Sequence, residues 1–290
     1  MIRSVALIGA GAMGAPMAWR VRGGGFDLMV CDRSEAALAP FASADVKVAQ
    51  RAADCADADM IVILVATPAQ MRGVIFGEDG LTSGLAPDRK PILAVMGTVP
   101  VEDIRQVRDR LAPLGVRVID APVSGGVVRA AEGTLTIIIG GEAADVAAAR
   151  PVFAAMGSNL FHCGAVGDAQ KVKLVNNLIC NAAAMITAEA YKLALEQGLD
   201  LAVLTEVLQV STGRNFLTAA PEGVSAAFAA MAPSRERFQA LLSIMSKDAH
   251  IAADLTAGPA TDYPAIRGLI SILDAAGDET FENWRLVSEG

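Results

Sequence analysis

The 290-residue sequence has few of the residues that metal sites, disulfide frameworks and nucleic-acid-binding surfaces require. Only two histidines are present, which argues against a His-rich metal site, and no bound metal is expected. The four cysteines are scattered without metal-like spacing, so they are interpreted as free thiols in a reducing cytosol. The net charge is −8 and no basic run occurs, which argues against nucleic acid or an anionic membrane as a partner.

Long hydrophobic runs are also lacking, although hydrophobic residues make up 53% of the chain. None approaches the roughly 18 residues that a membrane span needs. The most continuous run, residues 60–66, is typical of a strand buried on both faces. The apolar residues that follow Met1 resemble a signal peptide only superficially. The glycine spacing that comes next explains them better, so a cytoplasmic protein without a targeting signal is expected.

A glycine-rich motif between a predicted strand and a predicted helix is the first pattern that is present. The strand covers residues 2–8, and the helix runs from about residue 15 to 22. In this context the first glycine permits a tight turn, the second lets a pyrophosphate approach the backbone, and the third allows close helix–strand packing. Free N–H groups at the helix start then bind phosphate. An ordinary glycine-rich turn is the alternative. The loop residues expected at the cofactor are Gly9, Gly11, Ala12, Met13 and Gly14.

An acidic residue about 20 positions further on bears on the choice of cofactor. Asp32 ends the second predicted strand, residues 26–31. A carboxylate there can bind the adenosine ribose hydroxyls and repels a 2′-phosphate, which favours NAD. Arg33 could hold a 2′-phosphate instead, so NADP remains the alternative.

Further strands and helices follow, and threonines stand after two of the strands. Residues 51–59 are predicted to be helical, with acidic residues on a solvated edge. Thr67 and Thr98 follow strands predicted over 60–65 and 91–96, and ligands of open α/β sheets lie beyond the carboxyl ends of strands. Both threonines could instead cap helices. For Thr67 the two roles are weighted equally, whereas cofactor contact is favoured for Thr98.

The pattern changes after Gly164. Before it come predicted strands, of which the last cover residues 116–120, 134–139 and 159–163, with a helix over 143–155. After it strand-like runs disappear, and helices are predicted over 169–197, 201–211, 221–230, 238–257 and 263–276. This predicts an α/β Rossmann-type domain over residues 1–164 and an all-α domain over 165–290, joined by a long interdomain helix.

Two polar stretches could carry chemistry. Ser124-Gly125-Gly126 follows a proline and offers bare backbone N–H groups that can cradle a carboxylate, although a plain turn is the alternative. Lys173 and Asn177 are four residues apart, so they share one helix face. For Lys173 the alternative is a surface lysine that pairs with an acid such as Asp168. Lys171 lies on a different face and is assigned to solvent.

Four motifs together resemble the β-hydroxyacid dehydrogenases, the group that contains 3-hydroxyisobutyrate dehydrogenase and tartronate semialdehyde reductase. They are Gly9–Ala18, Asp120–Gly126, Gly167–Asn177 and Lys247-Asp248, and they span nearly the whole chain. The resemblance implies that members commonly form dimers or tetramers through the helical domain. It also implies a catalytic Lys173, a substrate carboxylate at Ser124, Gly125 and Gly126, a substrate-binding amide at Asn177, and cofactor contacts at Thr98 and Lys247.

Some residues depart from the family pattern. Asp168-Ala169 replaces the usual Thr or Ser followed by Gly, and Gly97 replaces the serine before Thr98. Asn176 stands where 6-phosphogluconate enzymes have histidine, which argues against a phosphosugar acid. Arg214 joins two helices of the second half and could grip a second anionic group of the substrate. A role at the end of the preceding helix is equally weighted.

The resemblance implies an enzyme that transfers a hydride between NAD(H) and a small 3-hydroxyacid, or reduces the matching semialdehyde. Lys173 would serve as general acid/base, because desolvation in a dry cleft disfavours the ammonium form. An NADPH-dependent imine reductase is an alternative, but those enzymes usually replace this lysine. A silent dinucleotide-binding interaction module is the other alternative, and it would be expected to have lost Lys173 or Ser124.

Overall fold

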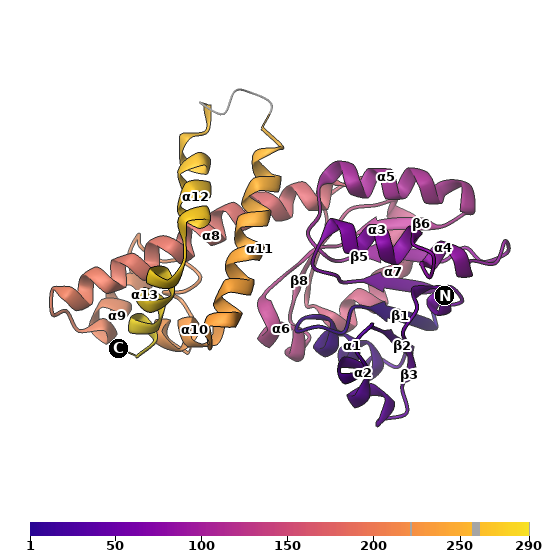
Figure 1. Cartoon of the computed structure of the whole chain (residues 1–290), viewed down its shortest axis with the longest axis horizontal. Helices are drawn as coiled ribbons and strands as arrows, with labels where there is room; N and C mark the ends of the chain where they lie inside the picture. The colour runs from indigo at the N-terminus through magenta and orange to yellow at the C-terminus, as the bar shows by residue number, and fades with distance from the viewer. Residues whose placement is uncertain (221, 257–261, 290) are drawn as a thin grey trace. The chain divides into compact units, whose positions relative to one another are not determined.

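The structure is a computed structural model that describes residues 1–220, 222–256 and 262–289 (Figure 1). The chain divides into two compact units, Met1–Lys173 and Leu174–Gly290. The predicted start of one helix, Pro221, and the predicted end of another, Ala257, lie outside the described residues. An α/β first part and a helical second part confirm the predicted fold class.

A six-stranded parallel sheet forms the centre of the first unit, in the order β3-β2-β1-β4-β5-β6. This is the strand order of a Rossmann-type dinucleotide-binding sheet, in which the order of the parallel strands reverses between β1 and β4. The strands are β1 (Ser4–Ile8), β2 (Asp27–Cys31), β3 (Lys47–Ala49), β4 (Met60–Ile63), β5 (Ile92–Val95) and β6 (Arg117–Asp120).

A smaller three-stranded sheet follows β6. Its order is β7-β8-β9, with β7 antiparallel and β9 parallel to β8. An antiparallel bridge between Asp120 and Gly140 connects it with the end of β6. The sheet therefore holds the segment after β6 close to the end of that strand. The strands are β7 (Val123–Ser124), β8 (Thr136–Ile139) and β9 (Asn159–His162).

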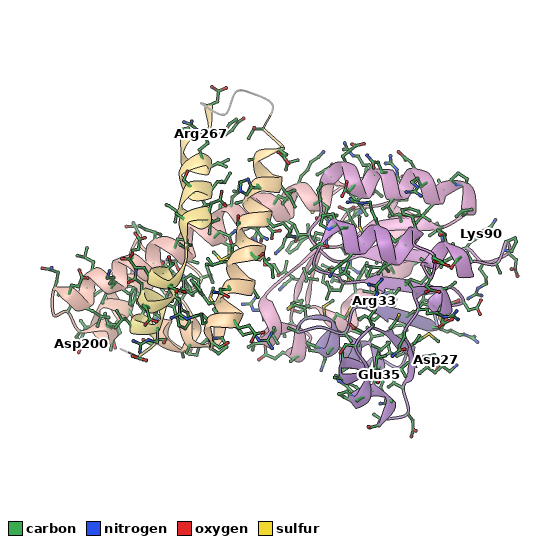
Figure 2. The ribbon with its side chains drawn as sticks, viewed as in Figure 1. Asp27, Arg33, Glu35, Lys90, Asp200 and Arg267 are labelled. Carbon is green, nitrogen blue, oxygen red and sulfur yellow. The ribbon has the colours of Figure 1, made fainter. Side chains whose placement is uncertain are left out.

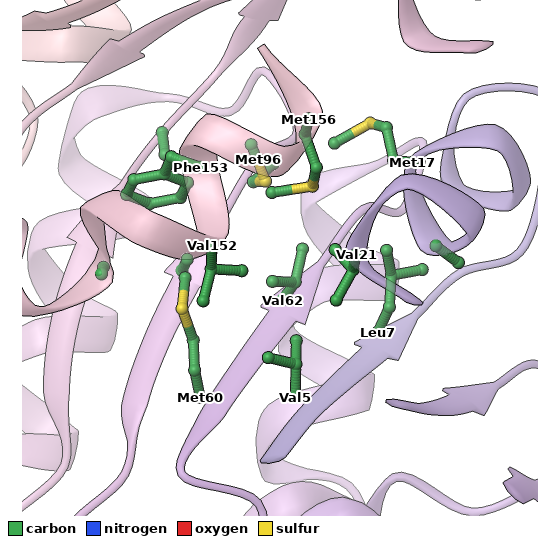
Figure 3. Close-up of a cluster of buried hydrophobic side chains, with 14 of the residues drawn as sticks. Val5, Leu7, Met17, Val21, Met60, Val62, Met96, Val152, Phe153 and Met156 are labelled. Carbon is green, nitrogen blue, oxygen red and sulfur yellow. The ribbon is translucent and has the colours of Figure 1, made fainter. Parts of the chain in front are cut away.

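Helices cover both faces of the large sheet, as strands that are apolar on both faces require. Leu7 and Val62 face a core that includes residues of α1 and α7 (Figure 3). Their neighbours Ala6 and Ile61 face the opposite core, which includes residues of α3 and α5. The helices of this unit are α1 (Gly14–Gly23), α2 (Glu35–Ala42), α3 (Pro68–Phe76), α4 (Leu81–Gly84), α5 (Val101–Leu111), α6 (Gly126–Glu132) and α7 (Ala143–Met156), with short 3-10 helices at Ala52–Cys55 and Ala112–Leu114.

The helix predicted over residues 51–59 is reduced to a single 3-10 turn, Ala52–Cys55. The prediction of a solvated acidic edge is wrong for Asp59. Its Oδ2 accepts hydrogen bonds from the backbone N–H groups of Arg3 and Ser4, at 2.8 and 3.1 Å. These bonds tie the start of β1 to the residue before β4, which competes with continuing a helix through this segment.

The second unit is helical. Its core contains Trp284, Phe228 and Phe238, and the indole contacts both phenyl rings edge-on. The final helix was not predicted from the sequence, although it supplies this tryptophan. The helices are α9 (Leu201–Val210), α10 (Val224–Met231), α11 (Arg235–Ala253), α12 (Pro264–Ala275) and α13 (Asp278–Glu289), preceded by α8 (Asp168–Glu196), which starts in the first unit.

Helix α8 is the one described helix that is long and apolar enough to cross a membrane by length and composition. The sequence did not suggest this, because no continuous apolar run is present. Its polar side chains bond inside the second unit: Asn181 donates to the carbonyl of Met245 at 3.2 Å, and the Tyr191 hydroxyl lies 2.8 Å from that of Thr205. These bonds support a role for α8 as a core helix of that unit.

Candidate functional site

The glycine loop between β1 and α1 has the geometry of a phosphate-binding turn. A Cβ at Gly9 would lie 2.2 Å from the Leu64 carbonyl oxygen, and a Cβ at Gly14 would lie 1.8 Å from the Gly9 carbonyl oxygen. Both positions therefore require glycine. Gly11, in contrast, is exposed and borders open space, so a ligand can approach its backbone. Met13, the residue before α1, supplies no side-chain cap, which leaves N–H donors at the helix start for phosphate oxygens.

Asp32 is held firmly at the end of β2. Its Oδ2 accepts from the backbone N–H of Ala10 at 2.8 Å, and its Oδ1 accepts from that of Ser34 at 2.9 Å. The carboxylate thus links the glycine loop to the start of α2. Each carboxylate oxygen can accept more than one hydrogen bond, so capacity remains for hydroxyl groups of a ligand. Arg33 is exposed beside it, on the segment that leads into α2 (Figure 2).

The two threonines after β4 and β5 occupy different local settings. Thr67 caps α3: its Oγ1 accepts from the N–H of Gln70 at 3.1 Å, and Gln70 reaches back to the N–H of Thr67. This is the capping role that was weighted equally with cofactor contact. Thr98 lies between two peptide groups that Gln170 binds. The Gln170 side chain accepts from the Val99 N–H at 3.1 Å and donates to the Gly97 carbonyl at 3.0 Å.

Ser124 ends β7 and is followed by two glycines in left-handed conformations. Gly125 has φ 134° and Gly126 has φ 72°, values that other residues rarely adopt. Both glycines are exposed, and a Cβ at Gly126 would meet nothing within 4 Å. The backbone at Gly126 therefore borders open space, whereas a Cβ at Gly125 would lie 2.7 Å from Cδ of Arg129.

Asp120, at the end of β6, is a fully buried acid that the sequence analysis did not single out as a site residue. Its carboxylate accepts hydrogen bonds from the N–H of Gly167 at 2.9 Å and of Gln170 at 3.0 Å. Burial raises the pKa of Asp120 to about 6, although these hydrogen bonds act in the opposite direction. A charged residue directly after an apolar strand was the available signal.

The two lysines at the start of α8 differ as the sequence indicated. Lys171 is exposed, and its Nζ lies 2.8 Å from Oδ1 of Asp168. This ion pair lowers the pKa of Asp168. Lys173 is only 8% exposed. It lies about one helical turn after Gln170, whose backbone N–H the Asp120 carboxylate binds. Asp168, which was named as a possible partner of Lys173, pairs with Lys171.

In the second unit, Asp248 brings two of the predicted residues together. Its Oδ2 accepts from the side-chain amide of Asn177 at 2.6 Å, and its Oδ1 lies 2.9 Å from Nζ of Lys247. Asp248 is 2% exposed. The sequence analysis quoted this acid only as part of a motif. Its burial between α8 and α11 fixes the orientation of the Asn177 amide.

Arg214 and the two histidines remain to be placed. The Arg214 side chain is exposed after α9, and its guanidinium forms no ion pair with a residue that the structure describes. The imidazole of His162 bonds to the carbonyl oxygens of Gly141 and Gly164, and His250 pairs with Asp274. His162 therefore has a structural role, and His250 forms a partly exposed pair with Asp274. No group of three metal-binding side chains occurs among the described residues.

The strand order, the glycine loop and Asp32 define a Rossmann-type dinucleotide-binding protein. Comparison with known proteins narrows this class. Residues 4–164 match the family model described as the NAD binding domain of 6-phosphogluconate dehydrogenase. Residues 167–280 match the model described as NAD-binding of NADP-dependent 3-hydroxyisobutyrate dehydrogenase.

Characterised relatives extend over most of the chain. NAD-dependent L-serine dehydrogenase of Pseudomonas aeruginosa is 35% identical over 74% of this chain and 72% of its own. 3-Hydroxyisobutyrate dehydrogenase of the same organism is 37% identical over 73% and 71%. The structure of Mycobacterium tuberculosis 3-hydroxyisobutyrate dehydrogenase, solved with L-serine, has a TM-score of 0.78 and 28% identity over 100% of this chain and 99% of its own.

The chain belongs to the β-hydroxyacid dehydrogenase family. It is therefore an NAD(P)-dependent dehydrogenase that acts on a hydroxyl group. The residues present fit this cofactor, because Gly9 and Gly14 permit the tight loop and Gly11 leaves its backbone open. NAD and NADP are both consistent with the family models.

Proposed function

We propose that the protein oxidises a small 3-hydroxyacid with NAD, or reduces the matching semialdehyde, and that Lys173 is the general acid/base. The nicotinamide, when bound, accepts or returns the hydride. The protein must then move one proton at the substrate oxygen. A buried amine on the first turns of α8 suits that task, because desolvation favours its neutral form and so allows it to take the proton.

The single observation that carries this proposal is the contrast between Lys173 and Lys171. Lys173 is 8% exposed, whereas Lys171 projects to solvent and pairs with Asp168. A surface lysine that only aids solubility would be exposed, because burial of an ammonium group lowers the stability of the fold. The helix that carries Lys173 is moreover tied to the end of β6 by Asp120.

The substrate is proposed to carry a carboxylate and a hydroxymethyl group on the same carbon. L-Serine and 3-hydroxyisobutyrate, which are named for two relatives, share this arrangement. We propose that Ser124 and the N–H groups of Gly125 and Gly126 hold the carboxylate, because both glycines are exposed, Gly126 borders open space and Ser124 adds a hydroxyl. The Asn177 amide, oriented by Asp248, is proposed to hold a further polar group.

The remaining proposed roles concern the cofactor and the far end of the substrate. We propose that Lys247, Thr67, Thr98 and the glycine loop contact the dinucleotide, with Asp32 at the ribose. Arg214, whose charge is unpaired among the described residues, is proposed to bind a distal anionic group of the substrate. A cytoplasmic location is proposed, which the free-thiol state of the four cysteines supports.

The test is a spectrophotometric panel at 340 nm with several 3-hydroxyacids, each with NAD and with NADP. Lys173→Ala should lower kcat by at least 100-fold while the dissociation constant for NADH is retained, since general acid–base groups contribute about 10²–10⁴-fold. Lys171→Ala, two residues away, is the matched control and should retain activity. Residual activity above about 1% of wild type in Lys173→Ala would rule out the proposed role.

The same panel tests the role of Arg214 if it includes a dianionic 3-hydroxyacid. Arg214→Ala should raise the KM for the dianion far more than the KM for a simple hydroxyacid. Equal effects on the two substrates would contradict a contact with the distal group. NADH binding by this variant serves as the control for its folding.

A further inference from the structure

Three segments of the first unit converge on one pair of buried side chains. Asp120 ends β6, four residues before Ser124, and is completely buried. Gln170 lies in the first turn of α8, three residues before Lys173, and is also completely buried. The carboxylate of Asp120 binds the backbone N–H of Gln170 at 3.0 Å, so the two residues form one connected group.

Asp120 holds the start of α8. It accepts from two N–H groups there, those of Gly167 and Gln170, which belong to the donors that an α-helix leaves unpaired at its N-terminus. An acid at this end also interacts favourably with the helix dipole. Because the helix is rigid beyond its first turn, fixing Gly167 and Gln170 also fixes the backbone of Lys173.

Gln170 holds the segment around Thr98. Its side-chain oxygen accepts from the Val99 N–H at 3.1 Å, and its nitrogen donates to the Gly97 carbonyl at 3.0 Å. The amide therefore binds the peptide group on each side of Thr98. A carboxylate or an amine at position 170 could make only one of these two bonds.

The burial of a carboxylate here is unfavourable for the fold by itself. Burial raises the pKa of Asp120, and the nearby carboxylate of Asp168 acts in the same direction. Cys163 also faces Asp120, and Arg105 lies close to Gly167 and acts on Asp168. A neutral residue would avoid the desolvation penalty, so the retention of an acid requires another explanation.

We propose that Asp120 and Gln170 are positioning residues of the dehydrogenase, which set Lys173 relative to the Ser124 loop and the Thr98 segment. This inference rests on the proposed role of Lys173. Neither residue is assigned to the substrate or the reacting atoms. Their effect is to hold three backbone segments in one arrangement, and displacement of reacting groups by about 1 Å can lower rates by roughly 100-fold.

The first test replaces Asp120 by asparagine, which keeps the size but places an N–H₂ donor opposite one of the two N–H groups that now donate to the two carboxylate oxygens. Asp120→Asn should lower kcat by roughly 100-fold with NADH binding retained. Asp168→Asn is the matched control, since it removes an acid from the helical turn that Asp120 holds, and the Asp168 carboxylate bonds to the Ala165 N–H and to Lys171 rather than to Gly167 or Gln170. Its kcat should change less than threefold. Similar losses in the two variants would overturn the proposal.

The pH dependence separates Asp120 from Lys173. Lys173 must be neutral to take a proton during oxidation and protonated to give one during reduction, so its titration affects the two directions oppositely. Asp120 must be ionised in both. The wild-type kcat for reduction should therefore fall as pH drops below about 6, and this fall should be absent in Asp120→Asn. Its persistence in the variant would overturn the proposal.

Gln170→Met provides a second route if Asp120→Asn does not fold. Methionine keeps the length of the side chain but cannot bind Val99 and Gly97. The variant should lose about tenfold or more in kcat while KM for the hydroxyacid changes little. An unchanged kcat would contradict the role of Gln170. If Lys173→Ala is active while Asp120→Asn and Gln170→Met are impaired, the proposed function fails and the positioning role concerns another group.

Discussion

At the residue scale, Asp32 and Arg33 present opposite charges directly after β2. The Asp32 carboxylate is fixed by the N–H groups of Ala10 and Ser34, whereas the Arg33 side chain is exposed. A fixed anion is pre-organised for the ribose hydroxyls and repels a phosphate at that place. The exposed cation can approach a phosphate only by ordering a long side chain, which costs conformational entropy. NAD should therefore be preferred.

Asp32→Asn is expected to reverse this preference. The amide keeps the shape of the side chain but removes the charge, so kcat/KM with NAD should fall by about 10–100-fold, the range of hydrogen bonds to charged groups. With NADP it should rise. Glu35→Gln, which removes an exposed acid three residues further on, is the control and should change neither value substantially (Figure 2). A wild-type enzyme that prefers NADP would contradict the interpretation.

At the element scale, one face of α8 is both apolar and exposed. Val175, Ile179, Ile186 and Leu193 are 55%, 69%, 61% and 57% exposed. Their spacing of four, seven and seven residues keeps them on a single stripe of a helix with 3.6 residues per turn. Such a stripe in the described part of the unit favours burial against a second copy of the chain. We therefore propose a dimer or tetramer, as the family resemblance implies.

Ile186→Asp should disrupt that assembly. We expect the wild-type protein to sediment as a dimer or tetramer and the variant to shift toward a monomer, because an unpaired charge would be buried at the interface. Lys192→Glu also adds negative charge to α8, but on another face, and should leave the mass unchanged. A monomeric wild-type protein in analytical ultracentrifugation would contradict the proposal.

The elements themselves were predictable to different degrees. Within the predicted run 60–66, residues 60–63 form a buried central strand, because apolar, largely β-branched residues fit a sheet covered on both faces. The helix predicted over 51–59 failed because Asp59 binds backbone groups of Arg3 and Ser4, 56 and 55 residues away. Periodicity reports local preference and contains no information about such distant partners.

The same limit applies to the candidate site. The glycine loop could be predicted from its local spacing, whereas the role proposed for Lys173 rests on the family resemblance. The partners of Asp120 are 47 and 50 residues away, so periodicity and spacing could not indicate that this acid anchors α8. The role of Asp248 was equally hidden, since Asn177 lies 71 residues before it. Residues that support a site depend on tertiary structure, whereas motif residues are visible in the chain.

At the scale of the whole molecule, the buried Asp120 and the partly exposed Asp59 change the free energy of unfolding in opposite directions as pH rises. The folded-state pKa of Asp120 is raised to about 6, so the unfolded chain releases this proton first and stability falls as pH rises from about 4 to 6. The effect is on the order of 3 kcal/mol. Backbone hydrogen bonds lower the pKa of Asp59, whose contribution is lost as pH falls below about 4.

The thermal midpoint should therefore be higher at pH 5 than at pH 7.5, by a few degrees for a protein of this size. Differential scanning calorimetry in low-salt buffers would measure it. In Asp120→Asn the difference between the two pH values should largely disappear. A wild-type midpoint that rises between pH 5 and 7.5 would show that other groups outweigh Asp120.

The boundary between the two compact units falls inside a helix, directly after Lys173, and this has a consequence for dissecting or recombining the protein. A fragment that stops at Lys173 would keep only six residues of α8, which is too short for a stable helix, since nucleation is unfavourable and short helices are marginal in water. Chimeras with relatives should instead be joined near Gly164 or Gly198, which flank α8 in left-handed turns. A chimera that keeps the proposed chemistry would then need the whole of α8 from a single parent.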